Sequence, residues 1–281
     1  MTQTDNRLSG VQALLAAVVV LAFVFAGLFG NWLAPYDPVQ QDLGQTLKPP
    51  AWHADGSRAH LLGTAALGQD ILSGVMAGAR VSLLVSVCAV GLSGLVGVTL
   101  GLVAGYLGGW IDSLFMRLAD IQMSIPFILL AIALIGALGP SLGNVILVIA
   151  ITNWVTYAKV VRTETMRLRE RDFVKFARVS GTPLFTLLRR HILPNVMNSI
   201  IVLVTLDMGK VIIFESGLSF LGLGVQPPTP SWGSMLADGR KYVSIAYWTS
   251  VFPGIAIFVV VLCVNFLGNW IRVRTDPKAQ P

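Results

Sequence analysis

Residues 81–106 read VSLLVSVCAVGLSGLVGVTLGLVAGY and contain no charged side chain. A helix needs about 20 apolar residues to cross the roughly 30 Å hydrocarbon core of a bilayer. Lipid offers no partner for a backbone N–H or C=O, so a run of this length must be helical there. The stretch therefore predicts a transmembrane helix.

Five further apolar runs of similar length flank this helix, at residues 14–33, 118–138, 144–160, 196–218 and 248–270. Hydrophobic residues make up 54% of the chain and charged residues only 12%, whereas soluble domains carry about 25% charged residues. The alternating segments of a transmembrane barrel do not occur. We expect an all-α integral membrane protein with about six transmembrane helices.

The distribution of Lys and Arg predicts the orientation, because basic residues collect in cytoplasmic loops. Six spans place both termini on one side of the membrane. With the termini inside, the inner segments hold thirteen basic residues and the outer segments hold five. We therefore expect cytoplasmic termini, and we attribute the net charge of +6 to membrane orientation rather than to nucleic-acid binding.

The spans divide the chain into a cytoplasmic tail (1–13), the first helix with a long outer loop (14–80), a five-helix core (81–270) and a second cytoplasmic tail (271–281). The outer loop and the outer segment 226–247 contain several prolines, which predict a turn-rich lid or a simple connection. Trp232 and Trp248 are expected to anchor at the outer membrane interface.

The cytoplasmic loop 162–194 is too long for a simple turn between adjacent helices. Asp172 is a candidate N-cap. The helix that follows would carry four residues on one face, at i, i+3, i+4 and i+7, namely Phe173, Phe176, Ala177 and Ser180. Gly181 suits the left-handed conformation that ends a helix.

A second short helix is predicted directly after this glycine. Thr182 is a candidate cap and Pro183 fits the first helical position. Pro194 would close the segment before the next span. This compact helical pair has an apolar side, which favours docking into a groove on another protein. The alternative is a helix that lies on lipid headgroups, drawn there by its arginines.

The chain carries no phosphate-binding motif of the form Gly-x-x-x-x-Gly-Lys-Ser/Thr. Gly209-Lys210 is followed by Val211, so we expect no ATP binding on this chain. No metal cluster and no nucleophile–base arrangement stands out. Cys88 and Cys263 lie within apolar runs and are expected to be free thiols. We predict no cofactor and no enzymatic activity on this polypeptide.

A stripe of small residues at i+4 spacing runs along the second span: Ala89, Ser93, Gly97, Gly101 and Gly105. Small residues allow a neighbouring helix to approach closely. The stripe could contact a partner subunit or pack within the chain, and we favour packing within the chain.

Few ionisable residues fall within the spans, and these should face protein or a wet cavity: Asp120, Asp207, Lys210 and Glu215. Asp207 and Lys210 are three residues apart, so they can pair on one helix face. They could line a polar translocation pathway or form a neutralised structural pair. We favour the structural pair.

The run 173–181, FVKFARVSG, is followed after nine residues by His191-Ile192-Leu193-Pro194. This pattern resembles the EAA loop of permeases of bacterial ABC importers, with Lys175-Phe176-Ala177 at the family's Glu-Ala-Ala. In that family the loop inserts into a cleft on the ATPase subunit. The resemblance implies a coupling role for Phe173, Phe176, Ala177, Arg178, Gly181, Thr182, Pro183 and Pro194.

Four further stretches resemble the dipeptide/oligopeptide importers, which include nickel and glutathione importers. They are HLLGT at 60–64, GQD at 68–70, GARVSL at 78–83 and ESGLSFLGLG at 215–224. They match the subunit type with a long first outer loop. The resemblance implies a type I ABC importer permease fold.

The resemblance also implies the partners of this chain in a bacterial inner membrane. These are a second homologous permease subunit, two ATPase subunits that hold ATP and Mg, and an extracytoplasmic substrate-binding protein. The function implied is ATP-driven import of short peptides or a similar small polar solute by alternating access. The alternatives are a stand-alone ion-coupled secondary transporter, with Asp207, Lys210 or Glu215 titrating, and a non-transporting scaffold.

Overall fold

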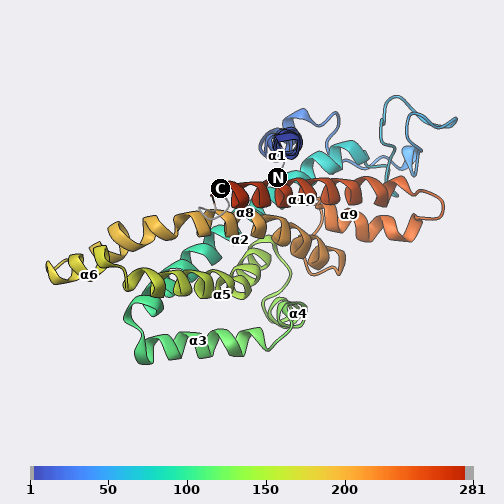
Figure 1. Ribbon diagram of the computed structural model, residues 1–281. Helices are drawn as coiled ribbons and strands as arrows, with labels where there is room; N and C mark the ends of the chain where they lie inside the picture. Colours follow the sequence, from blue (N-terminus) through green and yellow to red (C-terminus); the bar gives the residue numbers. More distant parts are fainter. Residues whose placement is uncertain (1–2, 276–281) are drawn as a thin grey trace.

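The computed structural model describes residues 3–275, which contain ten α helices and short 3₁₀ and π segments (Figure 1). The elements are α1 (Gln3–Leu33), η1 (Leu43–Gln45), α2 (Ile71–Leu107), α3 (Gly109–Met123), α4 (Phe127–Leu138), α5 (Leu142–Arg169), α6 (Asp172–Val179), α7 (Leu184–Leu187), η2 (Leu188–Ile192), α8 (Leu193–Phe220), α9 (Trp232–Gly239), η3 (Arg240–Tyr242) and α10 (Trp248–Thr275).

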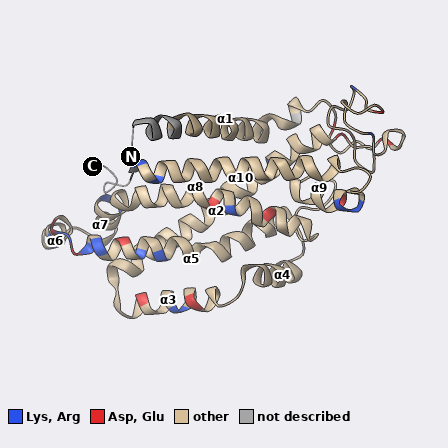
Figure 2. Ribbon diagram, turned by 45° about the vertical axis from the view of Figure 1, so that its right-hand side comes forward, with Lys and Arg blue, Asp and Glu red and all other residues tan. Residues whose placement is uncertain are grey.

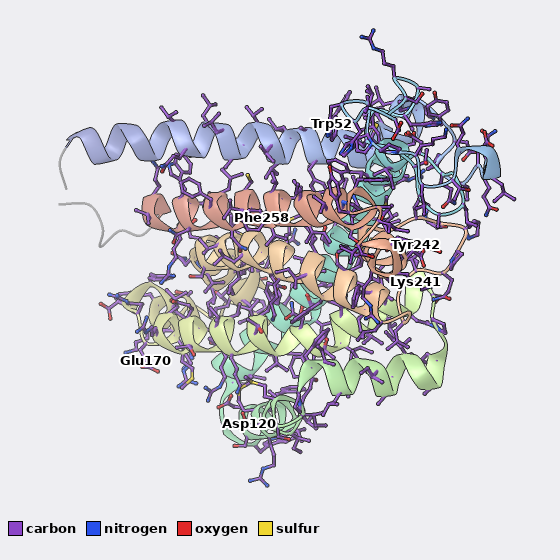
Figure 3. All side chains as sticks on the ribbon, turned by 90° about the vertical axis from the view of Figure 1, so that its right-hand side faces the viewer. Trp52, Asp120, Glu170, Lys241, Tyr242 and Phe258 are labelled. Atoms are coloured by element: carbon purple, nitrogen blue, oxygen red, sulfur yellow. The ribbon has the colours of Figure 1, made fainter. Side chains whose placement is uncertain are left out.

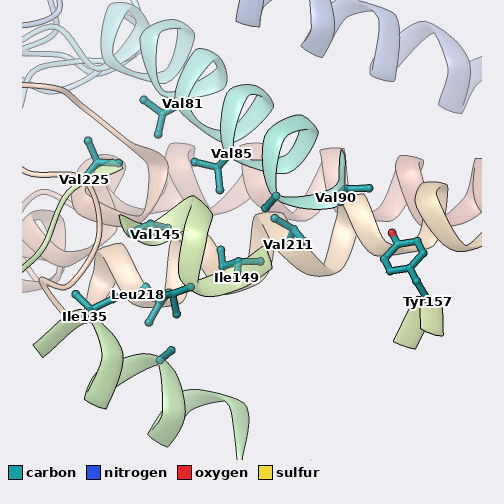
Figure 4. Packing of buried hydrophobic residues seen from close by; sticks show 13 residues of the cluster. Val81, Val85, Val90, Ile135, Val145, Ile149, Tyr157, Val211, Leu218 and Val225 are labelled. Carbon is teal, nitrogen blue, oxygen red and sulfur yellow. The ribbon is translucent and has the colours of Figure 1, made fainter. Parts of the chain in front are cut away.

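The long helices pack side by side, with α2 in the middle of the bundle. Helix α2 contacts α5 along much of its length and also packs against α1 and α8. Helix α1 lies on one side of the bundle next to α10, and α3 lies on the opposite side beyond α5 (Figures 1 and 2). The central core joins α2, α4, α5 and α8 through residues such as Val85, Ile135, Ile149 and Val211 (Figure 4).

Five helices are long and apolar enough to cross a membrane, within residues 3–275. They are α1, α2, α5, the continuous helix Leu184–Phe220 and α10. The predicted span 118–138 is not one helix. It divides into α3 and α4, which meet at 90° and pass the same test only as a pair. The all-α membrane fold with about six spans is confirmed: the described residues hold five long apolar helices and this bent pair, which is either a broken span or a re-entrant segment.

Pro126 explains the break between α3 and α4. A proline has no N–H to donate, and its ring disfavours helical geometry at the preceding residue, here Ile125. Pro126 has φ −56° and ψ 133°, and α4 begins at Phe127. The hydropathy of the stretch carried no information about this corner.

Several helices extend beyond the predicted spans. Helix α2 begins at Ile71, ten residues earlier than predicted, because the Asp70 carboxylate accepts hydrogen bonds from the Ser73 N–H (2.8 Å) and hydroxyl (2.7 Å). Helix α5 continues to Arg169 and α10 to Thr275. Residues 3–13 and 271–275 of the two predicted cytoplasmic tails are therefore helical, and residues 1–2 and 276–281 lie outside the described residues.

Residues 34–70 and 221–247 gather at one end of the bundle, which we call the outer end. Trp52, Lys241 and Tyr242 lie there, and Glu170 lies at the opposite end (Figure 3). The loop 34–70 consists of turns and η1. It is fastened to α2 by a hydrogen bond of 3.2 Å from the Tyr36 N–H to the Ser73 hydroxyl.

Trp232 and Trp248 do not anchor at a membrane interface as the sequence suggested. Their side chains are buried, and each indole N–H donates to a backbone carbonyl inside the outer end. Trp232 binds Val75 O at 2.8 Å, and Trp248 binds Thr64 O at 3.1 Å. Both tryptophans therefore fix the outer segments onto the bundle.

Candidate functional site

Helices α6 and α7 form a small knob at the end of the bundle opposite the outer end (Figure 2). The underside of this knob is buried. Val174 of α6 and Leu187 of α7 pack with Val161 of α5 and Val196 of α8. The face predicted for the first short helix did not include Val174, although this residue is apolar and fully buried against the bundle.

The side of the knob opposite its buried underside is exposed. The exposed fractions of Phe176, Val179 and Phe185 are 72%, 86% and 72%, and Phe173 is exposed to 42%. Ala177, predicted on the same face as Phe176, packs instead toward the buried side. The exposed apolar face of the knob therefore consists mainly of Phe173, Phe176, Val179 and Phe185, of which the sequence pattern identified the first two.

Tyr106, near the end of α2, links the knob to the bundle. Arg178 of α6 donates from Nε to the Tyr106 hydroxyl at 3.1 Å, and its guanidinium lies 5.1 Å from the centre of the ring. Arg169 of α5 donates to the Tyr106 carbonyl at 3.1 Å. These contacts attach the knob to α2 as well as to α5.

Lys175 of α6 has an acidic neighbour at the base of the knob. Its ammonium lies 3.5 Å from Glu170 Oε2, and the Arg169 guanidinium lies 3.3 Å from Glu170 Oε1. The hydrogen bond from Arg169 and the charge of Lys175 hold the pKa of Glu170 below its ordinary value.

The turn between α6 and α7 lies at the predicted residue. Gly181 has φ +74°, a conformation in which a Cβ is strained, and the Thr182 N–H bonds to Ala177 O at 3.1 Å. The two predicted caps are wrong. Asp172 is the first residue of α6, after Arg171, and Pro183 rather than Thr182 precedes α7 without a side-chain cap.

Pro194 does not separate the knob from the next span. Helix α7 continues through the π turn η2 into α8, and the Leu193 N–H bonds to Leu188 O. An ordinary α-helical turn would bring the Pro194 ring against the carbonyl four residues earlier, and the wider π turn relieves that contact. The exposed Pro194 therefore lies within one helix, Leu184–Phe220.

The small-residue stripe of α2 faces α5 of the same chain. Gly97, Gly101 and Gly105 lie directly against the backbone of α5 near Trp154, Ala158 and Arg162 respectively. Ala89 and Ser93 are fully buried on the same stripe. The matching i+4 spacing on both helices lets their backbones approach over several turns.

Asp207 of α8 and two residues of α5 form a polar cluster within the spans. The Asp207 carboxylate accepts hydrogen bonds from the Tyr157 hydroxyl at 3.0 Å and from the Asn153 amide. Lys210 lies 3.9 Å from Asp207 Oδ1 and donates to Asn153 Oδ1 at 3.0 Å. The predicted pair is thus part of a network in which Asp207 is buried and Lys210 is partly exposed.

Glu215 lies one turn closer to the outer end of α8 and faces the interior of the protein. It is fully buried and accepts hydrogen bonds from the hydroxyls of Ser219 (2.8 Å), Ser82 (3.3 Å) and Ser216 (3.4 Å). This environment is that of a structural acceptor between α2 and α8. The predicted Asp120 is exposed on α3 and pairs with Lys159 of α5 at 2.8 Å.

The long apolar helices define an integral membrane protein of the multi-pass helical class, with an exposed apolar knob at one end. Residues 97–280 match the binding-protein-dependent transport system inner membrane component. Residues 12–50 match the N-terminal transmembrane domain of oligopeptide transport permease C. The chain belongs to this family and is a permease subunit of an ABC importer.

Curated relatives match almost the whole chain. A di/tripeptide transport system permease of Pseudomonas aeruginosa is 42% identical over 95% of this chain and 88% of its own length. A dipeptide permease of Haemophilus influenzae is 37% identical over 95% and 90%. A glutathione transport system permease of Escherichia coli is 42% identical over 95% and 86%.

A solved structure shows the same fold. The MetNI methionine ABC transporter, in an inward-facing conformation, superposes with a TM-score of 0.58 over 72% of this chain and 96% of its own chain, at 17% identity. The fold is therefore that of an ABC importer permease, and not that of the stand-alone ion-coupled carrier which the sequence had left as an alternative.

Proposed function

We propose that this chain forms one half of the pathway of an importer for short peptides in a bacterial inner membrane. The substrate class follows from the relatives, whose names include di/tripeptide and glutathione transport. The second half of the pathway would be a homologous permease, and an extracytoplasmic binding protein would deliver the peptide to the outer end.

Two separate ATPase subunits, holding ATP and Mg, would supply the energy through the knob. This step is supported by the two faces of the knob. Val174 and Leu187 are buried on one face, and the other face exposes the apolar side chains of Phe176, Val179 and Phe185. A short helix that shows an apolar face fits a groove on another protein. The π-turn connection to α8 would pass its movement into the spans.

Replacing Phe176 by glutamate tests this docking. A carboxylate in an apolar groove would be left without a partner, so we expect docking to weaken by about 2 kcal/mol or more, a loss in affinity of about thirtyfold. The measurement is co-purification of the ATPase subunits with the F176E permease, followed by ATP-driven uptake of a dipeptide into proteoliposomes.

Leu43→Glu is the matched control, because Leu43 is exposed to 73% on the outer loop and Phe176 to 72% on the knob. We expect L43E to retain its ATPase subunits. Retention of the ATPases and of ATP-driven uptake by F176E would show that the knob is not the docking site.

A further inference from the structure

Lys210 lies in the middle of a membrane-spanning helix. It precedes the outer end of α8 at Phe220 by ten residues, or about 15 Å of helix, roughly half of the hydrocarbon thickness. A lysine at this depth must face protein or water, because lipid does not solvate an ammonium group. This chain alone does not cover it, since 45% of the side chain is exposed.

The neighbours of Lys210 fix the ammonium but leave part of it free to bind. Its hydrogen bond to Asn153 Oδ1 is 3.0 Å long, whereas Asp207 Oδ1 lies 3.9 Å away, beyond hydrogen-bonding distance. A lysine ammonium has three N–H donors. The Asp207 carboxylate, in turn, accepts hydrogen bonds from Tyr157 and Asn153 at Oδ2, while its Oδ1 faces Lys210.

An aromatic surface lies beside this ammonium. The Lys210 Nζ atom is 5.2 Å from the centre of the Phe214 ring, and Phe214 stacks on Phe127 of α4 with the ring centres 3.8 Å apart. On the exposed side of α8, Ile213 and Gly217 continue the stripe that begins at Lys210. The surface thus combines a fixed cation with apolar and aromatic side chains, two kinds of group that line small-molecule sites.

We propose that Lys210 binds the C-terminal carboxylate of the transported peptide halfway across the membrane. This inference rests on the proposed function, because a short peptide carries a free carboxylate at that terminus. Asn153 is a positioning residue that holds the ammonium on the exposed side of α8. Asp207 keeps Asn153 in place, and its own charge faces the α5–α8 interface rather than the substrate.

The test uses the complete importer, purified with its partner subunits and reconstituted in proteoliposomes with its binding protein. Uptake of dialanine is compared with uptake of dialanine amide, which lacks the carboxylate. The readout is the ratio of kcat/KM for the two peptides. The same binding protein serves every variant, so a change in the ratio belongs to the permease.

We expect Lys210→Met to lower the preference for the free acid by about tenfold or more, the usual size of a hydrogen bond to a charged group. Lys210→Arg keeps the charge and should retain most of the preference. Lys159→Met is the matched control, a second partly exposed lysine that pairs with Asp120 away from the cluster, and it should leave the ratio unchanged.

An unchanged ratio in an active K210M importer would overturn the proposal. Should K210M fail to assemble, Lys210→Gln is measured in its place. Failure of both variants to assemble also overturns the proposal, since it assigns Lys210 to the contact with the second permease. Absence of ATP-driven peptide uptake by the unmodified importer would instead contradict the proposed function itself.

Discussion

Glu215 illustrates how single polar residues are accommodated inside this bundle. Its side chain is fully buried, and three serine hydroxyls from α2 and α8 donate to it. A buried polar group is costly unless it is hydrogen-bonded, and the loss of one partner strands the others. The sequence showed that Glu215 is unusual for a span but not which residues satisfy it, because those contacts join segments far apart along the chain.

Replacing Glu215 by alanine should therefore destabilise the protein by about 2–4 kcal/mol. The substitution leaves a cavity and also leaves the three serine hydroxyls without their acceptor. Glu215→Gln keeps the volume and one acceptor oxygen, and we expect a smaller loss. Thermal unfolding of the two variants in detergent gives the comparison. Equal melting temperatures for E215A and the unmodified protein would show that the serine cluster contributes nothing to stability.

At the scale of the helices, some features of the fold can be predicted from neighbouring residues and others cannot. Apolar length located the five continuous spans, and Gly181 located the turn of the knob because its positive φ is a local requirement. The division at Pro126 and the continuity of α7 with α8 were missed. A proline breaks one helix and is absorbed by a π turn in another, and only the packing around each proline decides between these outcomes.

The contact between α2 and α5 yields a prediction at the scale of helices. A Cβ added at Gly97 would lie 2.3 Å from the carbonyl oxygen of Trp154, a backbone atom that cannot rotate away. Gly97→Ala should force the helices apart and destabilise the bundle by about 1–3 kcal/mol. The midpoint of thermal unfolding in detergent measures this effect.

Gly91→Ala, on the same helix, is the control for the Gly97 variant. No atom lies within 4 Å of a Cβ at Gly91, so alanine should be neutral or should add up to about 1 kcal/mol of helix propensity. A similar change in melting temperature for the two variants would contradict the close packing of α2 on α5.

At the scale of the whole molecule, the number of spans and the arginine-rich end could be predicted, because hydrophobic length and basic charge are summed properties. The exposed apolar face of the knob was predicted only in part. Val179 and Phe185 complete it, and their exposure depends on how α6 and α7 rotate about Val174 and Leu187. Rotation of this kind is set by tertiary packing and is not visible in a periodic pattern.

The orientation itself can be tested with single cysteines in a variant that lacks Cys88 and Cys263. Val179→Cys lies on the knob and Leu43→Cys on the outer loop, and both positions are well exposed. A membrane-impermeant maleimide should label L43C in intact spheroplasts and V179C only after permeabilisation. The reverse pattern would place the knob outside and invalidate the orientation predicted from the arginines.

Because residues Leu184–Phe220 form one continuous helix, a small tilt at the knob produces a larger displacement further along the helix. Phe185 and Lys210 are 25 residues apart on one helix, which corresponds to an arm of about 38 Å. A tilt of about 10° at the knob would swing the Lys210 ammonium sideways by about 7 Å, comparable with the length of a dipeptide. ATPase subunits that gripped only the cytoplasmic tip could in this way move a charge at mid-membrane without touching the pathway.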